Sequence, residues 1–132
     1  MTLKDQVVSL DLAKRLKELD FKQESIFYWK DYEERNSGKP QIVYGKDNSW
    51  YKFYSAYTVA ELGEMLPTFI PGARATDYDD VYSLSISKTE GLVWEISYCG
   101  SGDSGCLKIF NDDNLVNAMA KMLIYLKENN LI

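Results

Sequence analysis

The first pattern along the chain is a helical spacing of leucines. Leu12, Leu16 and Leu19 fall on one face of a predicted helix that begins after Ser9. Ser9 is the expected N-cap, and Asp11 lies in the first turn, where the helix dipole favours a negative charge. The pattern therefore predicts an amphipathic helix that packs on another element through its leucine face.

A second helical pattern lies towards the other end of the sequence. Asp112 or Asp113 is the expected cap at its start, and Asn129 and Asn130 are expected to end it. Its apolar positions form a wide stripe, which predicts a helix that faces the core. These positions are Leu115, Val116, Met119, Met122, Leu123 and Leu126.

A short helix is predicted between these two from local signals. Thr58 and Glu61 have the spacing of a capping box, in which each side chain satisfies a backbone group at the helix start. Tyr57 and Leu62 have the spacing of a hydrophobic staple. Pro67 then ends the helix, because proline cannot continue the backbone hydrogen bonding.

Two groups of strands lie between the helices. In both groups, β-branched and aromatic residues alternate with other residues at the period of a strand, and turn-forming residues separate the runs. We expect the first three strands to form a meander and the next two to form a hairpin with one polar and one apolar face. In order, the predicted elements are a helix that follows Ser9 within the stretch 8–19, strands at 25–32, 41–44 and 50–54, a helix at 59–66, an irregular connection at 68–80, strands at 81–87, 92–99 and 107–110, and the last helix.

The order of these elements favours an α+β domain. Strands come in runs instead of alternating with helices, which is typical of an antiparallel sheet with helices packed on one face. We expect one domain over residues 1–132, with three helices and a mostly antiparallel sheet of about five to six strands, in the order α-βββ-α-βββ-α. A chain of 132 residues that is 45% hydrophobic can bury a core without a structural metal or a disulfide.

The composition excludes several kinds of catalysis. The chain has no histidine, so it cannot carry a Ser-His-Asp triad, a Cys-His pair or a histidine metal site. Its two cysteines, Cys99 and Cys106, are too few for a secreted disulfide scaffold. We expect both to stay reduced, although their places on either side of a turn would let them bridge on oxidation.

Acidic residues are concentrated in one part of the chain. The net charge is −5, which argues against a general duplex-DNA-binding protein. Residues 61–113 hold 10 acidic and 3 basic side chains, whereas residues 1–60 are nearly balanced. A local acidic surface is therefore expected. Solvated loops and strand edges are its favoured interpretation, and a docking patch for a basic partner is the alternative.

The sequence predicts no targeting or membrane segment. The first ten residues include Lys4 and Asp5 and lack an apolar run of signal-peptide length. No later stretch approaches the roughly 18 apolar residues that a membrane span needs. We therefore expect a cytoplasmic protein with no membrane partner.

A glycine-rich loop matches the spacing of a dinucleotide-binding fingerprint. Gly100, Gly102 and Gly105 follow the G-x-G-x-x-G pattern, in which the third glycine leads into a helix. Here residues 106–110 have the pattern of a strand instead. The favoured interpretation is a flexible hairpin loop, with nucleotide binding as a weak alternative, and no cofactor is predicted.

Three carboxylates, Asp77, Asp79 and Asp80, resemble the start of a calcium loop. The glycine that such a loop needs at its sixth position is missing, and Lys88 stands where the closing glutamate would be. The spacing excludes an EF-hand, and no metal site is predicted. Weak binding of a divalent ion stays open, and with it a carboxylate-dependent hydrolase as the least favoured function.

Aromatic residues are concentrated in the first group of strands. Tyr28, Trp29, Trp50, Tyr51 and Tyr54 are interleaved with lysines. Core packing, contact with a partner protein and base stacking on single-stranded nucleic acid all use such residues. Core packing is the favoured interpretation, a protein interface comes second and nucleic acid third.

Several blocks of the sequence resemble small bacteriophage and prophage proteins of bacteria. They cover somewhat under half of the chain, at residues 8–19, 22–29, 54–67 and 120–132. The resemblance implies an origin in a mobile element and a place in the bacterial cytoplasm. It implies no activity and no catalytic residue, because no function is established for such proteins.

The expected function is therefore that of a non-enzymatic, phage-associated accessory protein that binds a host or phage protein in the cytoplasm. Single-stranded nucleic-acid binding through an aromatic sheet face is the alternative, and a hydrolase that uses carboxylates and a divalent ion is the third possibility. No catalytic residue is nominated. The candidate binding residues are the five aromatic residues, three aspartates and three glycines named above. The oligomeric state stays open.

Overall fold

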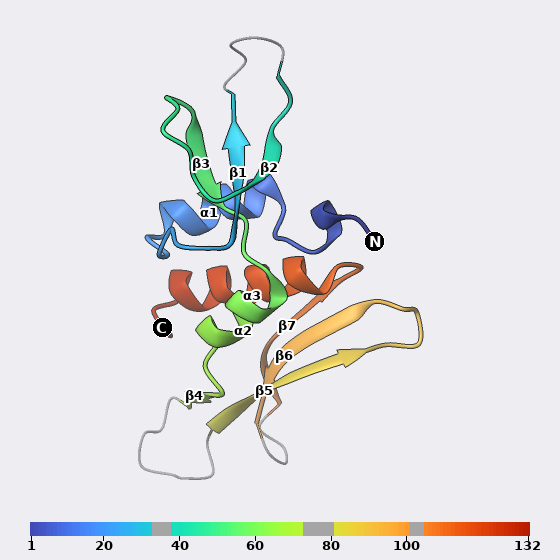
Figure 1. Ribbon diagram of the computed structural model, residues 1–132. Coiled ribbons are helices and arrows are strands. Elements are labelled where there is room, and N and C mark those ends of the chain that lie inside the picture. The colour runs from blue at the N-terminus through green and yellow to red at the C-terminus, as the bar shows by residue number, and fades with distance from the viewer. Residues whose placement is uncertain (33–37, 73–80, 101–104) are drawn as a thin grey trace.

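The computed structural model describes residues 1–32, 38–72, 81–100 and 105–132 (Figure 1). These residues form three α-helices, one short 3₁₀-helix and seven strands in two antiparallel sheets. The predicted α+β class is confirmed, but the strands form two sheets where one was expected. No helix in the described ranges is long and apolar enough to cross a membrane.

The first sheet has β1 (Phe27–Asp31) at its centre, between β2 (Gln41–Tyr44) and β3 (Lys52–Ser55). Both neighbours run antiparallel to β1. The predicted meander is wrong, because it would have placed β2 at the centre. β1 takes that place because Tyr28 and Trp29, which point to opposite faces, are both buried.

The second sheet has four strands in sequence order. They are β4 (Phe69–Pro71), β5 (Val81–Lys88), β6 (Trp94–Cys99) and β7 (Cys106–Asp112), and each runs antiparallel to the next. β4 lies in the stretch that was expected to be irregular. It is only three residues long and contains a proline, which a sheet tolerates at an edge strand such as this one.

The second sheet also carries a disulfide between Cys99 and Cys106. The expectation that both cysteines stay reduced is therefore wrong for this structure. The physical reason is the hairpin between β6 and β7. The Gly100 N–H donates to the Gly105 carbonyl at 2.8 Å, and the two cysteines are paired across the strands directly beside this bond.

The predicted starts of the first two helices are confirmed. α1 (Leu10–Glu18) has Ser9 as its N-cap, and α2 (Val59–Met65) begins with the capping box of Thr58 and Glu61. The Thr58 N–H donates to the Glu61 carboxylate at 2.8 Å, and the Glu61 N–H donates to the Thr58 hydroxyl at 3.3 Å. Both helices therefore start where the sequence predicts, and at α2 the Thr58 side chain accepts a capping hydrogen bond, whereas the Ser9 side chain at α1 accepts none.

The third helix, α3 (Leu115–Glu128), has a different cap from the predicted aspartates. Its N-cap is Asn114, whose side-chain oxygen accepts the Val116 N–H at 3.1 Å. Asp112 instead accepts the Asn114 N–H at 2.9 Å and pairs with Lys121 at 2.6 Å. The Asp112 carboxylate thus fixes the residues that lead into α3, and the Asn114 side chain caps the helix.

α3 lies in the middle of the molecule, with α1 and the first sheet on one side and the second sheet on the other (Figure 1). Trp29 enters the core from the first sheet, and its indole N–H donates to the Val8 carbonyl at 2.8 Å. Ile96 and Tyr98 enter it from the second sheet. One core therefore joins both sheets, and its largest share comes from α3: Val116, Ala118, Met119, Ala120, Met122, Leu123 and Leu126 are all buried.

Candidate functional site

The five aromatic residues proposed from the sequence do not share one surface. Trp29 and Tyr54 are paired across β1 and β3 and pack against the core. Tyr28 points to the opposite face of the sheet. Tyr51 lies on that same face, against Lys30 of β1. Trp50 is fully exposed in the connection between β2 and β3. The structure therefore separates this set into core, outer-face and exposed residues.

The outer face of the first sheet carries four rings and a lysine, which we call the aromatic cluster: Tyr28, Tyr32, Tyr51, Phe53 and Lys30. The Lys30 ammonium lies 5.4, 5.2 and 5.8 Å from the ring centres of Tyr32, Tyr51 and Phe53. The rings meet edge to face, Tyr28 with Phe53 and Tyr32 with Tyr51. The aromatic cluster is thus packed on itself and around a cation.

The positive charge of the aromatic cluster is also paired. The Lys30 ammonium donates to the Asp47 carboxylate at 2.5 Å. This hydrogen bond raises the pKa of Lys30 and lowers the pKa of Asp47 to about 2. Lys46 covers the Tyr28 ring at 5.0 Å. Since base stacking needs open ring faces, this arrangement favours a structural role for the aromatic cluster over nucleic-acid binding.

The glycine-rich loop leads into a strand, as the sequence predicts. Gly105 has a φ of +67°, a left-handed conformation that favours glycine, and β7 begins at the next residue. A dinucleotide fingerprint needs a helix at that point. Gly102, Asp77, Asp79 and Asp80 lie outside the described residues. Within the described ranges, no three acidic, cysteine or histidine side chains are placed together to hold a metal ion.

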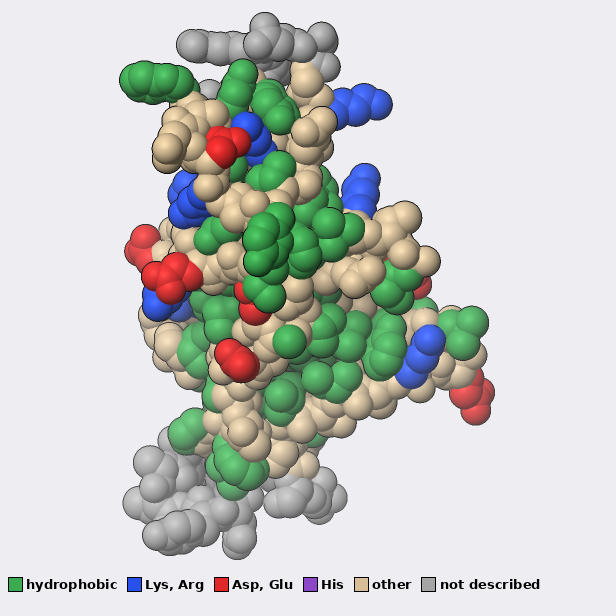
Figure 2. Space-filling view, in the orientation of Figure 1, with side chains coloured by type: hydrophobic (Ala, Val, Ile, Leu, Met, Phe, Trp, Pro, Cys, Tyr) green, Lys and Arg blue, Asp and Glu red, His purple; other side chains and the backbone are tan. Residues whose placement is uncertain are grey.

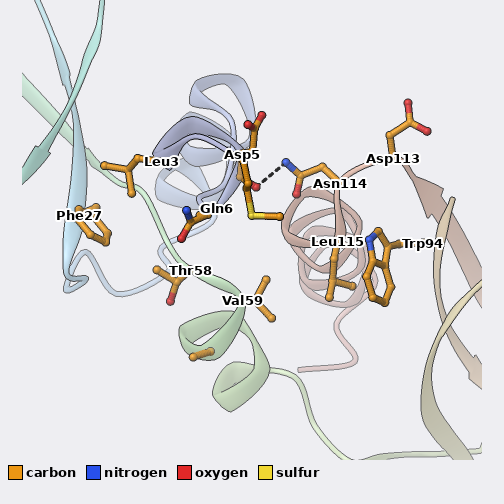
Figure 3. Close-up of a pocket in the computed structure, with 12 residues that line it drawn as sticks. Leu3, Asp5, Gln6, Phe27, Thr58, Val59, Trp94, Asp113, Asn114 and Leu115 are labelled. Carbon is orange, nitrogen blue, oxygen red and sulfur yellow. Dashed lines mark hydrogen bonds between the residues drawn. The ribbon is translucent and has the colours of Figure 1, made fainter. Parts of the chain in front are cut away.

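A cleft of about 580 Å³ lies where the two sheets and the starts of the helices meet (Figure 3). It is built from five separate parts of the chain: the first six residues, which include the 3₁₀-helix η1 (Leu3–Asp5), and the starts of β1, α2, β6 and α3. A volume of this size can bury a small ligand or several side chains. The lining residues are Met1, Leu3, Asp5, Gln6, Phe27, Thr58, Val59, Ala60, Trp94, Asp113, Asn114 and Leu115.

Contacts of the first residues hold the cleft together. Val7 forms an antiparallel bridge with Thr58, which fixes the chain to the start of α2. The Asn114 side-chain amide donates to the Asp5 carbonyl at 2.9 Å, which fixes the same stretch to the start of α3 (Figure 3). Both helix starts are therefore held at one end of the molecule, with the cleft between them.

The walls of the cleft are apolar. Leu3, Phe27, Val59, Trp94 and Leu115 line it from different elements (Figure 3). Leu3 is 39% exposed and Val59 is 38% exposed, so these side chains are only partly covered by the rest of the chain. Covering them with an apolar ligand would remove more of their surface from water, which is favourable.

Most polar side chains in the cleft already have partners. The Thr58 hydroxyl donates to the carboxylate of its capping box at 2.9 Å. The Asp5 carboxylate accepts the N–H and the hydroxyl of Thr2, both at 2.9 Å, and these bonds lower the pKa of Asp5. Asn114 caps α3. The cleft thus differs from a metabolite site, in which several free polar groups converge to orient the ligand.

Two carboxylates, Asp5 and Asp113, lie at the rim of the cleft, and its lining residues include no lysine or arginine. Figure 3 shows both carboxylates pointing away from the apolar walls. Asp113 is exposed and makes no ion pair with any described residue. The cleft therefore combines apolar walls with a negatively charged rim.

Exposed apolar side chains continue beyond the cleft. Phe27 packs edge to face on Tyr44 with ring centres 6.0 Å apart, and Tyr44 is 83% exposed. Figure 2 shows hydrophobic side chains gathered across the middle of this view of the molecule. Apolar patches of this kind mark interaction sites in soluble proteins.

No sequence motif marks the cleft. In the sequence pattern, Leu115 belongs to the core stripe of the last helix, and Val59 reads as an ordinary helical residue. The one available signal is that each directly follows an N-cap, Asn114 or Thr58. Because a cap lies at the end of a helix, the apolar residue beside it can face the surface instead of the core.

Comparison with known proteins leaves the cleft as the main guide to function. No protein family matches the chain, and no curated protein or solved structure matches it. A functional proposal therefore has to start from the geometry of the cleft and its rim.

Proposed function

We propose that this protein is a non-catalytic binding module that holds an apolar segment of a partner protein in the cleft. The observation that carries the proposal is the cleft of about 580 Å³ with walls of Leu3, Phe27, Val59, Trp94 and Leu115. Its polar side chains serve mainly to cap helices. The side chains of the cleft are therefore suited to apolar contact and not to proton transfer or nucleophilic attack.

A protein partner fits this surface better than a small molecule. The apolar surface extends past the cleft from Phe27 to Tyr44, which a ligand confined to the cleft would leave exposed. A protein segment can fill the cleft with one or two bulky side chains and cover the surrounding surface with its other residues. Protein interfaces commonly have this arrangement, with an apolar centre and a polar rim.

The partner in this proposal is a host or phage protein of the bacterial cytoplasm, as the resemblance to phage and prophage proteins implies. Cys99 and Cys106, which the structure joins by a disulfide, do not line the cleft. They are paired at one end of β6 and β7, whereas Trp94 is paired with Asp112 at the other end. The cleft therefore does not depend on the disulfide.

A displayed random-peptide library, selected on the purified protein, tests the proposal. Val59→Asp is the variant of choice, because it places a charge in the apolar wall at the first residue of α2, where the helix dipole favours an acidic side chain. Trp50→Asp is the matched control, because it also replaces an exposed apolar residue but lies in the connection between β2 and β3.

The selected peptides are expected to carry bulky apolar residues and to bind the natural protein and Trp50→Asp equally. Their affinity for Val59→Asp is expected to fall at least about tenfold, because a charge replaces part of the apolar contact. Circular dichroism and urea unfolding check that both variants fold. A library that yields no binder, or binders that tolerate Val59→Asp, would contradict the proposed function.

A further inference from the structure

The charged side chains around the cleft are unevenly placed. Asp5 lies between the cleft and a second cavity of about 450 Å³, which Lys4 and Lys39 also line. The N-terminal ammonium of Met1 and Lys4 offset the charge of Asp5. At the opposite rim, Lys88 lies over the Trp94 ring at 5.2 Å and does not line the cleft. Asp113 is therefore the rim carboxylate with the least compensation by this chain.

Asp113 also differs from its neighbour in the chain. Asp112 pairs with Lys121 at 2.6 Å and accepts the Asn114 N–H, so its charge is used within the fold. Asp113 is exposed, and its carboxylate forms no ion pair and accepts no hydrogen bond from any described residue. A positively charged group that approaches the rim from outside can therefore pair with Asp113 at no cost to an existing interaction.

We infer that the partner segment of the proposed function carries a lysine or arginine beside its apolar anchor, and that this cation binds at Asp113. The inference rests on the proposed function, because the apolar anchor brings the cation to the rim. Asp113 is one of the ten acidic residues between positions 61 and 113. Electrostatic complementarity of this kind selects partners and accelerates their encounter.

Other occupants fit the charge less well. A second copy of the chain carries the same net charge of −5 and the same acidic rim, so two copies would repel each other at the cleft. An acidic partner segment would face the same repulsion. The structure thus favours a basic segment of another protein.

Three synthetic ten-residue peptides test the inference. Each has a central tryptophan and leucine, and the flanking positions are all lysine, all glutamine or all glutamate. Binding is measured by fluorescence anisotropy at low and at high salt. The protein variants are Asp113→Lys and the matched control Glu64→Lys, which also reverses an exposed negative charge but lies on α2 at a position that does not line the cleft.

The lysine peptide is expected to bind the natural protein about fivefold more tightly than the glutamine peptide, and the glutamate peptide to bind most weakly. High salt should reduce these differences. Asp113→Lys should abolish the preference for lysine without changing the affinity for the glutamine peptide, whereas Glu64→Lys should retain the preference.

The possible failures separate the two claims. Equal binding of the lysine and glutamine peptides, or an unchanged preference in Asp113→Lys, overturns the inference and leaves the proposed function intact. Failure of all three peptides to bind overturns both. Sedimentation velocity adds a third outcome: a dimer that Val59→Asp dissociates would identify a second copy as the occupant and overturn the inference.

Discussion

Two regions of the molecule bring apolar side chains to the surface, and they do so differently. In the aromatic cluster, rings meet edge to face, and Lys30 lies within 5.8 Å of three ring centres and pairs with Asp47. In the cleft, Leu3, Phe27 and Val59 face open space. The aromatic cluster is thus a small set of packed side chains on the outer face of a sheet. The apolar walls of the cleft, in contrast, are only partly covered by the rest of the chain.

The difference shows why a count of aromatic residues does not locate a binding site. The aromatic residues of the first strands draw attention in the sequence because they are concentrated in two short stretches, yet those that form the aromatic cluster already have partners. The cleft draws none, because five distant parts of the chain build it. What distinguishes a binding surface is whether apolar groups are left without contacts after folding.

The largest expected effect compares one side chain from each region. Tyr28→Ala should lower the free energy of unfolding by about 3 kcal/mol, because the ring is buried and packs on Phe53. Val59→Ala should change it by less than about 0.5 kcal/mol, because Val59 faces the cleft. Urea unfolding measures both. A cost for Val59→Ala as large as that for Tyr28→Ala would show that the cleft is part of the core.

A second comparison separates stability from binding. Replacing both Cys99 and Cys106 by serine should lower the free energy of unfolding by about 2 to 3 kcal/mol, because the disulfide restricts the unfolded chain. Peptide binding to the cleft should stay the same. Calorimetry and fluorescence anisotropy on the same sample measure both quantities. Loss of binding in the double variant would mean that the hairpin end of the second sheet shapes the cleft.

Acid titration tests the pairing of Asp47 with Lys30. The pKa of Asp47 is lowered from 3.8 to about 2 in the folded protein, chiefly by the hydrogen bond from Lys30. The pair therefore stabilises the fold above about pH 4, and this contribution is lost as the pH falls through about 2. Asp47→Asn should flatten the dependence of stability on pH in that window. Urea unfolding between pH 2 and pH 5 is the measurement, and an unchanged pH dependence in Asp47→Asn would contradict the assignment.

The smallest expected effect concerns nucleic acid. The aromatic cluster leaves few ring faces open, so an oligothymidine strand should produce no saturable change in tryptophan fluorescence at low salt. Trp50, which is fully exposed, would be the reporter. Saturable quenching that disappears in Trp50→Ala would restore single-stranded nucleic acid as the ligand class.

Local signals predicted the secondary structure well. The capping box of Thr58 and Glu61 marks the start of α2 correctly, and Ser9 marks the start of α1. The capping box succeeds because it is an interaction between residues three positions apart, whereas the Ser9 side chain makes no capping hydrogen bond and the Ser9 N–H donates to the Asn117 side chain at 3.0 Å. For α3 the sequence predicts an aspartate as the cap, whereas the structure has Asn114. Several residues in a row can serve as caps there, and only their packing decides between them.

Long-range arrangement could not be predicted in the same way. The order β2-β1-β3 depends on which strand has both faces buried, and the division into two sheets depends on α3 lying between them. The disulfide depends on the register of β6 and β7. The cleft depends on all of these at once, since Phe27, Trp94 and Leu115 meet only after the sheets and helices have packed.

The most direct test of the account is to map where the lysine-flanked peptide binds. Amide resonances of the ¹⁵N-labelled protein are followed during a titration with that peptide. The account predicts that the resonances that shift belong to the cleft, among them those of Leu3, Val59 and Leu115. Shifts confined to the aromatic cluster, around Tyr32 and Tyr51, would contradict it.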